Sequence, residues 1–473
     1  MRPNRQLPSG WRPAAAVAAT ALLAAAGCTS TESSGIHAGA GHRGPNGVAV
    51  PGQASPADWP TFGRTPDRAG VSVSTPAMRK VSRSWTTGVD GAAYAQPLIV
   101  GSEVIVATEN DTVYALNAAS GKVRWSHHLA SPVTHGLPCG NISPSGITGT
   151  PAADPASGRL WVVTYTSQPK FRHTLWVLSL KTGRAISQRT IDAPGSDPRA
   201  EQERGALTLL GSRVYVPFGG LFGDCSDYKG RVVGAPLTGS GKLITFATSG
   251  QRQAGIWAPA GESVRNGDLY VSTGNGIPVD KIDDSDSVLR LSQRLTVLSR
   301  FTPSNFKSLS ANDQDLSSTA PALLPGGLVF QVGKEGEGYV LHDSNLGGTG
   351  GQATSANVCE GGFGGDAVDG HTVVFSCFSS LHAIRVIPGK KGGRPRITKL
   401  WSASIGAGPP IIAGGVVWDI DRSGSLRAYR LTTGKQVFST SIGKPATDFP
   451  TLAASGSRLI VTGSTKVISF VGA

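Results

Sequence analysis

The sequence predicts an all-β chain whose short strands form an eight-bladed β-propeller, with seven blades as the alternative count. Three observations lead to this fold class. The 473 residues include 63 glycines and 31 prolines but only 16% charged residues, which suits many short strands joined by turns. A unit of strand, hairpin, strand, turn and strand recurs about every 40 to 50 residues. Finally, strand-like segments at the two ends of this region complement each other, so the ring can close.

The most complete copy of the repeat is NDTVYALNAASGKVRWS, which spans residues 110–126. The run 104–106 and the alternation around 113–115 are typical of half-buried strands. Gly121 follows Ala-Ser in a tight turn, where a glycine can adopt a positive φ. Trp125 then lies on a third strand as a large aromatic on one face. Looser copies lie at 175–184, 233–242 and 427–438.

Repeats of this kind can be followed along the chain, although the fifth is poorly marked and leaves seven blades as an alternative. They occupy approximately residues 92–130, 146–191, 204–248, 255–305, 317–352, 361–404 and 407–443. The C-terminus offers three further strands and lacks a fourth, whereas segment 81–87 reads as an outer strand without inner ones. We therefore expect 81–87 to pair beside 466–470, which closes the ring and removes exposed sheet edges.

The N-terminus is typical of a secreted chain. Residues 1–27 combine arginines with an apolar run and predict a signal peptide, and Cys28 follows at a lipobox-like site. We expect lipidation of Cys28, a flexible tether over 28–58 and one propeller domain over 59–473. The expected location is extracytoplasmic, with a lipid anchor in the cell membrane. The alternative is ordinary cleavage after Ala26 and free secretion.

Cysteine parity agrees with that location. Lipidation of Cys28 leaves four of the five cysteines, and four allow three disulfide connectivities. We favour Cys359–Cys377, which closes a short hairpin-like span, and Cys139–Cys225, whose cysteines lie in loops of neighbouring repeats. The alternative is that one pair remains as buried thiols.

The formal charge of +13 bears on partners. Outside the cell, a basic surface favours anionic lipid or a cell-wall polymer as a neighbour and does not point to nucleic acid. A generally basic soluble surface is the alternative. We expect a monomer that binds an extracytoplasmic protein or a small-molecule ligand.

The repeats resemble those of the pyrroloquinoline-quinone (PQQ) type propeller family. That family includes outer-membrane assembly scaffold lipoproteins and quinoprotein alcohol dehydrogenases. The resemblance covers nearly all of residues 58–473 and implies the fold. It does not imply the chemistry, because the family contains both enzymes and scaffolds.

A more specific likeness lies in the middle of the chain. Trp257 and Asn275, eighteen positions apart, resemble the dehydrogenase segment in which a tryptophan lies under the quinone and an asparagine ligates calcium. By the same resemblance, Asp315 is the catalytic base and a metal ligand, and Lys334 contacts the quinone carbonyls and acts in catalysis. Asp224, or else Asp227, stands where the family has a metal-ligating glutamate.

These residue types suit that chemistry. A planar quinone stacks on an aromatic ring, and a hard cation takes amide and carboxylate oxygens. A lysine stabilises developing negative charge, and a carboxylate accepts the alcohol proton. The sequence departs from the dehydrogenase pattern in having no adjacent cysteine pair and no Cys-x-x-Cys-His haem motif.

Two further segments carry open alternatives. The acidic loop 280–286 could hold calcium or could be a solvated connection. Glu203 and Arg204 could lie at the mouth of the central channel or form an ion pair with each other.

We expect the chain to be a binding or scaffold module without turnover. The alternative is a PQQ- and calcium-dependent dehydrogenase that oxidises an alcohol or sugar. The two hypotheses differ on whether Trp257, Asn275, Asp315 and Lys334 gather at one place.

Overall fold

The computed structural model describes residues 54–473 except 79, 405–407 and 448, and these residues fall within one compact unit. The predicted signal peptide, the lipidation site Cys28 and most of the tether lie outside the described residues. Asp58, at the end of the predicted tether, is buried, and its carboxylate accepts hydrogen bonds from the backbone N–H groups of Ser55 and Gly101.

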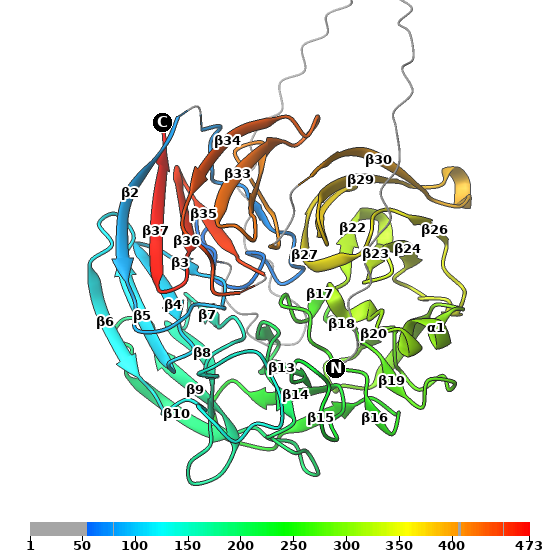
Figure 1. The fold of residues 1–473 in the computed structure, drawn as a ribbon, viewed down its shortest axis with the longest axis horizontal. Coiled ribbons are helices and arrows are strands. Elements are labelled where there is room, and N and C mark those ends of the chain that lie inside the picture. Colours follow the sequence, from blue (N-terminus) through cyan, green and yellow to red (C-terminus); the bar gives the residue numbers. More distant parts are fainter. Residues whose placement is uncertain (1–53, 79, 405–407, 448) are drawn as a thin grey trace, which may run out of the picture. The chain divides into compact units, whose positions relative to one another are not determined.

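Eight blades follow one another around a ring, each built on four antiparallel strands, and in three of them a further short strand joins the sheet (Figure 1). The first four blades comprise β3 (Leu98–Val100), β4 (Glu103–Ala107), β5 (Thr112–Asn117) and β6 (Val123–His128); β7 (Ala152–Asp154), β8 (Arg159–Thr166), β9 (Arg172–Ser179) and β10 (Ala185–Thr190); β12 (Thr208–Leu210), β13 (Arg213–Gly220), β14 (Arg231–Pro236) and β15 (Ile244–Ala247); and β17 (Ser263–Arg265), β18 (Asp268–Ser272), β20 (Val288–Leu291) and β21 (Val297–Thr302).

The last four blades comprise β22 (Ala322–Leu324), β23 (Leu328–Val332), β24 (Glu337–His342) and β26 (Thr354–Asn357); β27 (Gly362–Asp369), β28 (Thr372–Cys377), β29 (Leu381–Ile387) and β30 (Arg396–Ala403); β31 (Ile411–Ala413), β32 (Val416–Ile420), β33 (Ser425–Arg430) and β34 (Gln436–Ser441); and β35 (Leu452–Ser455), β36 (Arg458–Thr462), β37 (Lys466–Gly472) and β2 (Val81–Gly88).

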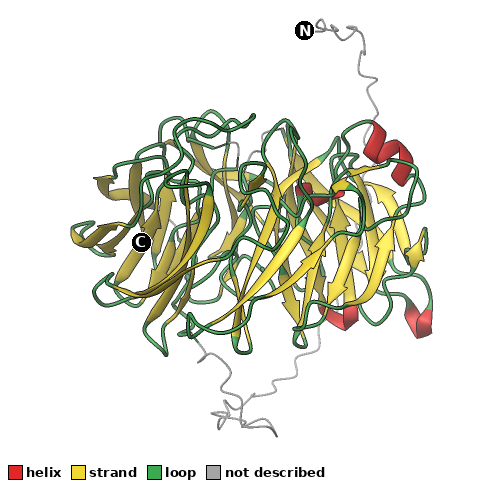
Figure 2. Ribbon diagram, turned by 90° about the horizontal axis from the view of Figure 1, so that it is seen from below, coloured by secondary structure: helices red, strands yellow, loops and turns green. Residues whose placement is uncertain are grey.

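Short additional elements decorate the ring, and helix is rare (Figure 2). The described helices are α1 (Phe306–Ala311), η1 (Leu316–Ser318), η2 (Pro325–Gly327) and η3 (Lys390–Gly392). The extra strands are β1 (Val71–Ser72), β11 (Glu201–Gln202), β16 (Arg252–Gln253), β19 (Gly276–Ile277) and β25 (Gly348–Thr349). The prediction of an all-β propeller is confirmed.

Burial explains the strand sequences. The second strand of a blade, such as β4 with its sequence EVIVA, is buried on both faces and is rich in β-branched residues. The outer strands β6, β10 and β34 instead alternate between exposed and half-buried positions. An inner strand packs against neighbouring blades on both sides, whereas an outer strand has one face toward water.

The repeat motif locks each marked blade to the next. Trp85, on the outer strand β2, donates its indole N–H to the carbonyl of Ala118 in the turn of the following blade, at 2.9 Å. Gly121 has a φ of 71°, and a Cβ there would lie 2.6 Å from the Trp85 ring. Trp125 and Trp401 make the same hydrogen bond to Leu180 and Leu431. The conserved spacing of turn and tryptophan within this chain therefore reflects contact between blades.

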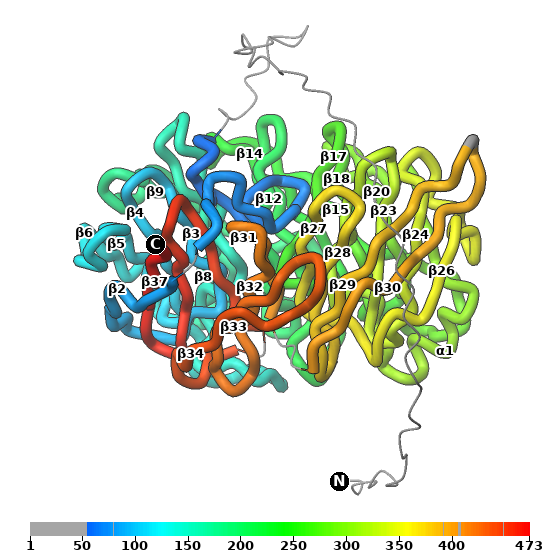
Figure 3. Tube along the Cα trace, turned by 90° about the horizontal axis from the view of Figure 1, so that it is seen from above, coloured from blue at the N-terminus to red at the C-terminus, as the bar shows by residue number. Residues whose placement is uncertain are grey.

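The ring closes as the sequence predicts. Strand β2 pairs antiparallel with β37, from Val81 opposite Gly472 to Gly88 opposite Lys466 (Figure 3). This pairing completes the eighth blade and decides against seven. The poorly marked fifth blade takes its outer strand from Thr354–Asn357, beyond the predicted end of that repeat at 352, so that boundary was wrong.

Antiparallel pairing places alternate connections on opposite faces of the ring. We call the upper face the one that carries the connections between second and third strands and between successive blades. Both predicted disulfides are present: Cys139–Cys225 joins two such connections, and Cys359–Cys377 joins one of them to the last residue of β28. The predicted connectivity is confirmed.

Candidate functional site

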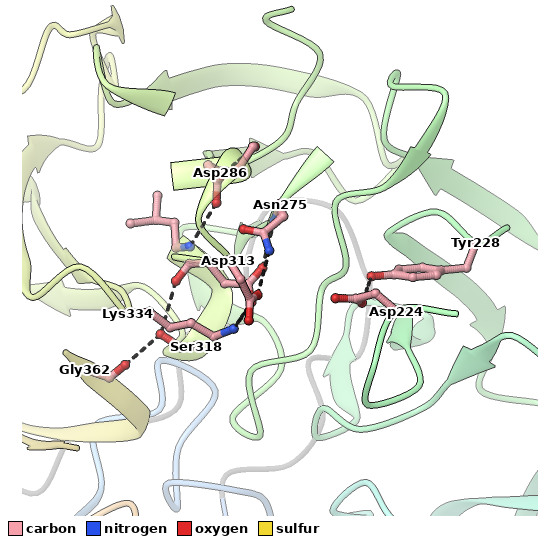
Figure 4. Close-up of polar contacts among 11 residues, drawn as sticks. Asp224, Tyr228, Asn275, Asp286, Asp313, Ser318, Lys334 and Gly362 are labelled. Atoms are coloured by element: carbon pink, nitrogen blue, oxygen red, sulfur yellow. Dashed lines mark hydrogen bonds and ion pairs between the residues drawn. The ribbon is translucent and has the colours of Figure 1, made fainter. Parts of the chain in front are cut away.

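The four side chains singled out in the middle of the chain come from four connections on the upper face. Trp257 lies between β15 and β17, and Asn275 lies between β18 and β20. Asp315 lies between β21 and β22, and Lys334 lies between β23 and β24. Residues up to 77 positions apart therefore meet because three successive blades present their loops on one side. Figure 4 shows Asn275, Asp313 and Lys334 within this group.

Lys334 is the centre of the group. Its Nζ lies 2.5 Å from Asp315 Oδ2 and 2.8 Å from Asp313 Oδ1. The same ammonium lies 5.7 Å from the centre of the Trp257 ring, over its face. A cation over an aromatic ring is favourable, and two carboxylates balance its charge.

Asn275 joins the group through its backbone and its side chain. Its backbone N–H donates to Asp315 Oδ1 at 2.8 Å, and its Nδ2 donates to Asp313 Oδ1 at 2.8 Å. Within the described residues its Oδ1 is buried and has no hydrogen-bond partner. A buried amide oxygen without a donor is costly unless a ligand satisfies it. This oxygen can therefore serve as a ligand for a cation.

Glycines allow the close approach of these loops. A Cβ at Gly274 would lie within 2.1 Å of Asp315 Oδ1, so a side chain there would displace the carboxylate. A Cβ at Gly333 would lie 2.7 Å from the Asp315 carbonyl oxygen, which accepts the Lys334 backbone N–H at 3.0 Å. The Gly-Asn and Gly-Lys pairs are thus explained by contact with Asp315.

A second layer holds the Asp315 segment. The carboxylate of Asp286 accepts hydrogen bonds from the Leu316 backbone N–H at 3.2 Å and from the Ser310 hydroxyl at 2.6 Å. The Ser318 hydroxyl donates to the Gly362 carbonyl at 2.7 Å, which ties the segment to the next blade (Figure 4).

Burial and charge set the protonation of this group. Burial raises the pKa of Asp315, with Lys334 opposing the shift. Burial alone would lower the pKa of Lys334, but Asp315 and Asp313 outweigh it, so the pKa of Lys334 is raised. Burial is also the main reason that the pKa of Asp286 rises to about 8. The site thus combines a fixed cation with a carboxylate that is a stronger base than usual.

The structure does not bring Asp224 into this group. Its carboxylate accepts the Tyr228 hydroxyl at 2.5 Å, and the two form a separate pair in Figure 4. Asp227, the alternative, is mostly exposed and pairs with Arg252 at 3.2 Å. Of the three predicted metal ligands, Asn275 and Asp315 are in contact and Asp224 has another partner.

The acidic loop 280–286 differs from a solvated connection. Asp283, Asp284 and Asp286 are buried. Asp284 pairs with Arg300 at 3.0 Å and accepts hydrogen bonds from Ser249, and Asp286 supports the Asp315 segment. The serines that donate to these carboxylates, Ser249 and Ser310, lie outside the loop, so the sequence of the loop itself carried no signal for these roles.

Phe449, the aromatic neighbour of Trp257, had no sequence signal. Phe449 lies 6.4 Å from Trp257 between ring centres, and the Arg204 guanidinium lies 5.4 Å from the Phe449 ring and 5.7 Å from that of Tyr94. Both residues are buried, and Glu203 accepts the Gly149 backbone N–H at 3.1 Å. Arg204 therefore lies near the candidate site through its contact with Phe449, whereas Glu203 is held by a backbone group of another connection.

The residues present fit a quinone and a cation in part. Trp257 is half-buried and offers a ring, Lys334 offers a cation for carbonyl oxygens, and Asn275 offers an unsatisfied oxygen. A cation there would gain Asn275 and Asp315 as protein ligands. Among the described residues, the one close trio of His, Cys, Asp or Glu ligand atoms is Cys359, Glu360 and Cys377, two of which form a disulfide.

Comparisons with known proteins agree with this fold. A PQQ-type family model described as outer membrane protein assembly factor BamB matches residues 82–277. A polyvinylalcohol dehydrogenase from a Pseudomonas species is 24% identical over 233 residues, which cover 44% of this chain and 34% of that protein. The chain thus spans about a third of the length of the curated relatives that it matches.

Solved structures give the same architecture. A quinohemoprotein alcohol dehydrogenase from Pseudomonas putida superposes with a TM-score of 0.67 at 13% identity, covering 88% of this chain and 80% of that one. BamB from Moraxella catarrhalis gives a TM-score of 0.57 at 13% identity, covering 83% and 100%. In the described part of the chain, no helix has both the length and the apolar character needed to cross a membrane.

Proposed function

We propose that the upper face of this β-propeller, which is similar to the PQQ-type family over residues 82–277, binds PQQ with a divalent cation such as calcium and oxidises an alcohol. One observation carries the proposal. Trp257, Asn275, Asp315 and Lys334, which the dehydrogenase resemblance selects, form one connected group. Scattered side chains would have argued for a scaffold alone.

When bound, PQQ supplies an acceptor for the two electrons released by alcohol oxidation. The protein's residues prepare the substrate. Asp315 accepts the hydroxyl proton, because its carboxylate is buried and its pKa is raised. The Asn275 N–H fixes the orientation of that carboxylate. Lys334 holds a positive charge between Asp315 and the Trp257 face, and this charge would stabilise negative charge on the carbonyl oxygens of a bound quinone.

The substrate class proposed is an alcohol or sugar. The name of the polyvinylalcohol dehydrogenases, to which 44% of this chain aligns, supports a hydroxylated aliphatic substrate. The test is reconstitution of the full chain with PQQ and Ca²⁺, followed by dye reduction with ethanol, glucose and polyvinyl alcohol. PQQ-dependent reduction of the dye by at least one of them is the expected result. Absence of dye reduction, together with an unchanged melting temperature on adding PQQ, contradicts the proposal.

A binding or scaffold module without turnover is the second candidate. It is favoured by large apolar side chains on the same face, since Phe222 is 69% and Phe378 57% exposed. Asp224, engaged with Tyr228, also leaves the cation with fewer protein ligands. Binding of an extracytoplasmic protein through this face, without binding of PQQ, would support this second function.

For location we propose an extracytoplasmic monomer, held at the cell membrane by lipid on Cys28. The two disulfides support an oxidising compartment. The matching family model, which describes an outer membrane assembly factor, agrees with this location. Fractionation tests the anchor: Cys28→Ala should move the protein from the membrane to the soluble fraction, and retention at the membrane would contradict lipidation.

A further inference from the structure

A polar pocket lies between the first and second blades, lined in part by Thr164, Thr174 and Thr190 and here called the threonine pocket. We propose that it binds a sugar acid, that is, a carboxylate carried on a hydroxylated ring. The pocket encloses about 480 Å³, within the range of sites for small ligands. None of the four residues of the candidate site lines it, so the inference goes beyond the proposed function and does not rest on it.

One face of the second blade changes character along its strands. Val162 on β8 and Leu178 on β9 belong to a core cluster with residues of the first blade. Toward the upper face, the same side of the sheet carries threonines. Thr164 on β8, Thr174 on β9 and Thr190 on β10 lie opposite one another in register. Because side chains two positions apart share a face, Thr164 continues the face of Val162 and makes it polar.

The first blade does not cover this polar part of the face. Its outer strand β6 ends at His128, and the three residues that follow, 129–131, line the pocket from the side of the first blade. Trp176 also lines the pocket and is half-buried, and its indole N–H donates to the Thr164 hydroxyl at 2.9 Å. A ring fixed in this way offers apolar surface to the C–H groups of a sugar.

Most polar side chains of the threonine pocket are available to a ligand. Within the described part of the chain, Gln168, Thr174, Gln188 and Thr190 make no side-chain hydrogen bond. Gln168, Gln188 and Thr190 are exposed. Hydroxyl and amide groups can each donate and accept, as the hydroxyl groups of a sugar do. The pocket therefore suits a ligand with several hydroxyl groups.

The formal charge in the pocket is positive, since two arginines and no described acidic residue line it. Arg172 lies opposite Thr166, on the threonine face, and its guanidinium has no hydrogen bond or ion pair with the described residues. Arg189 precedes Thr190 and so points to the other face, where it donates to the Gly241 carbonyl at 2.8 Å. One available guanidinium matches the single charge and two oxygens of a carboxylate.

The test measures binding of D-glucuronate to the full chain without PQQ, by calorimetry or ligand-observed NMR. D-glucose lacks the carboxylate and acetate lacks the ring, and we expect glucuronate to bind about tenfold more tightly than either. Arg172→Gln should weaken glucuronate binding about tenfold and Thr190→Val about threefold, as one charged and one neutral hydrogen bond are lost. The matched control is Arg189→Gln, which removes the same charge from the neighbouring position and should leave binding unchanged.

Several outcomes would overturn the inference. Glucuronate that binds no more tightly than glucose or acetate would refute the ligand class, and equal losses in Arg172→Gln and Arg189→Gln would refute the site. Trp257→Ala should leave glucuronate binding unchanged, and a loss there would move the ligand to the candidate site.

Two further measurements complete the test. Because the Arg172 guanidinium has no partner among the described residues, Arg172→Gln should keep its melting temperature, and a lower value would contradict that premise. Polygalacturonate distinguishes the sources of the ligand. Competition with glucuronate would support a uronate unit of a polymer, whereas binding of glucuronate without such competition would support a free sugar acid.

Discussion

At the scale of residues, the candidate site contains two aspartates that share one lysine but differ in environment. The Asp315 side chain is 10% exposed, whereas that of Asp313 is 70% exposed. Both lie within 2.8 Å of Lys334 Nζ. Because water screens the exposed carboxylate, the buried one has the stronger effect on a reacting hydroxyl.

This difference gives a matched pair of variants. Asp315→Asn should reduce the rate of dye reduction about a thousandfold, because an amide cannot accept the hydroxyl proton. Asp313→Asn preserves the size of the side chain and removes the same charge. It should reduce the rate of dye reduction by less than about tenfold. Comparable rates in the two variants would show that Asp315 is not the base.

The raised pKa of Asp315 predicts the pH dependence. The base must be ionised, so kcat/KM should increase with pH until it passes the pKa of Asp315, and the midpoint should lie above the range of an ordinary aspartate. Lys334→Met removes the positive charge that opposes this shift, and the midpoint should therefore move further up. An unchanged midpoint in Lys334→Met would show that Lys334 does not influence the pKa of the group that titrates.

At the scale of elements, the lock between outer-strand tryptophan and turn glycine organises the ring. Gly434 has a φ of 67°, and a Cβ there would lie 2.6 Å from the Trp401 ring. Gly158 has a φ of 65° in a turn where a Cβ would meet nothing within 4 Å. The two glycines therefore share a backbone requirement but differ in contact with a neighbouring blade.

Substitution of both glycines isolates the lock. Gly158→Ala should lower the free energy of unfolding by about 1 kcal/mol, the cost of alanine at positive φ. Gly434→Ala should cost about 1–3 kcal/mol more, because its methyl group overlaps the indole. Denaturant unfolding measures the free energy of unfolding of both variants. Equal losses would show that the contact between Gly434 and Trp401 does not add to stability.

Sequence reasoning succeeded where structure is local or repeated. The turn at Gly121 and the strand 81–87 carried their own signals, since β-branched runs, a turn glycine and a missing fourth strand are visible in order. The grouping of Trp257, Asn275, Asp315 and Lys334 was predictable only through resemblance, because four separate loops contribute. Phe449 was not predictable, because its position depends on how blades seven and eight meet.

Carboxylates were the least predictable side chains. Asp224 has the residue type expected of a metal ligand, but its carboxylate accepts a hydrogen bond from Tyr228, four residues later. Asp284 and Asp286 lie in a run that resembles a solvated loop, yet they are buried by partners about 15 to 35 residues away. The sequence shows where the carboxylates are. The role of each carboxylate depends on the donor that it meets in the tertiary structure.

At the scale of the whole molecule, the ring buries several carboxyl groups whose pKa is raised mainly by desolvation. The values are about 7 for Glu109 and Glu262, about 8 for Asp286, Asp366 and Asp419, and about 9 for Asp111. Between about pH 4 and pH 8 the folded chain therefore holds more protons than the unfolded chain. Stability from these groups is complete below their unfolded pKa and is lost as pH rises through the folded values.

The expected result is a melting temperature that falls as pH rises from 5 to 8. Asp419→Asn should remove part of this fall and stabilise the fold by about 2 kcal/mol at pH 8, because both Asp419 oxygens are buried without partners among the described residues.

Asp421 is the matched control. Burial alone would raise the pKa of Asp421, but hydrogen bonds from Ser423, Ser425 and Arg427 lower it. The stabilisation by Asp421 is therefore present at neutral pH and is lost in acid. Asp421→Asn should therefore destabilise at pH 8. Stabilisation by both variants would contradict the assignment of these two carboxyls.

The central claim is that the upper-face group binds PQQ together with a cation. Calorimetric titration of PQQ into the full chain, with and without Ca²⁺, tests it most directly. We predict saturable binding that Ca²⁺ strengthens, weaker binding in Trp257→Ala, and loss of the Ca²⁺ effect in Asn275→Ala. The absence of saturable PQQ binding, or binding that is unchanged in both variants, would contradict the claim.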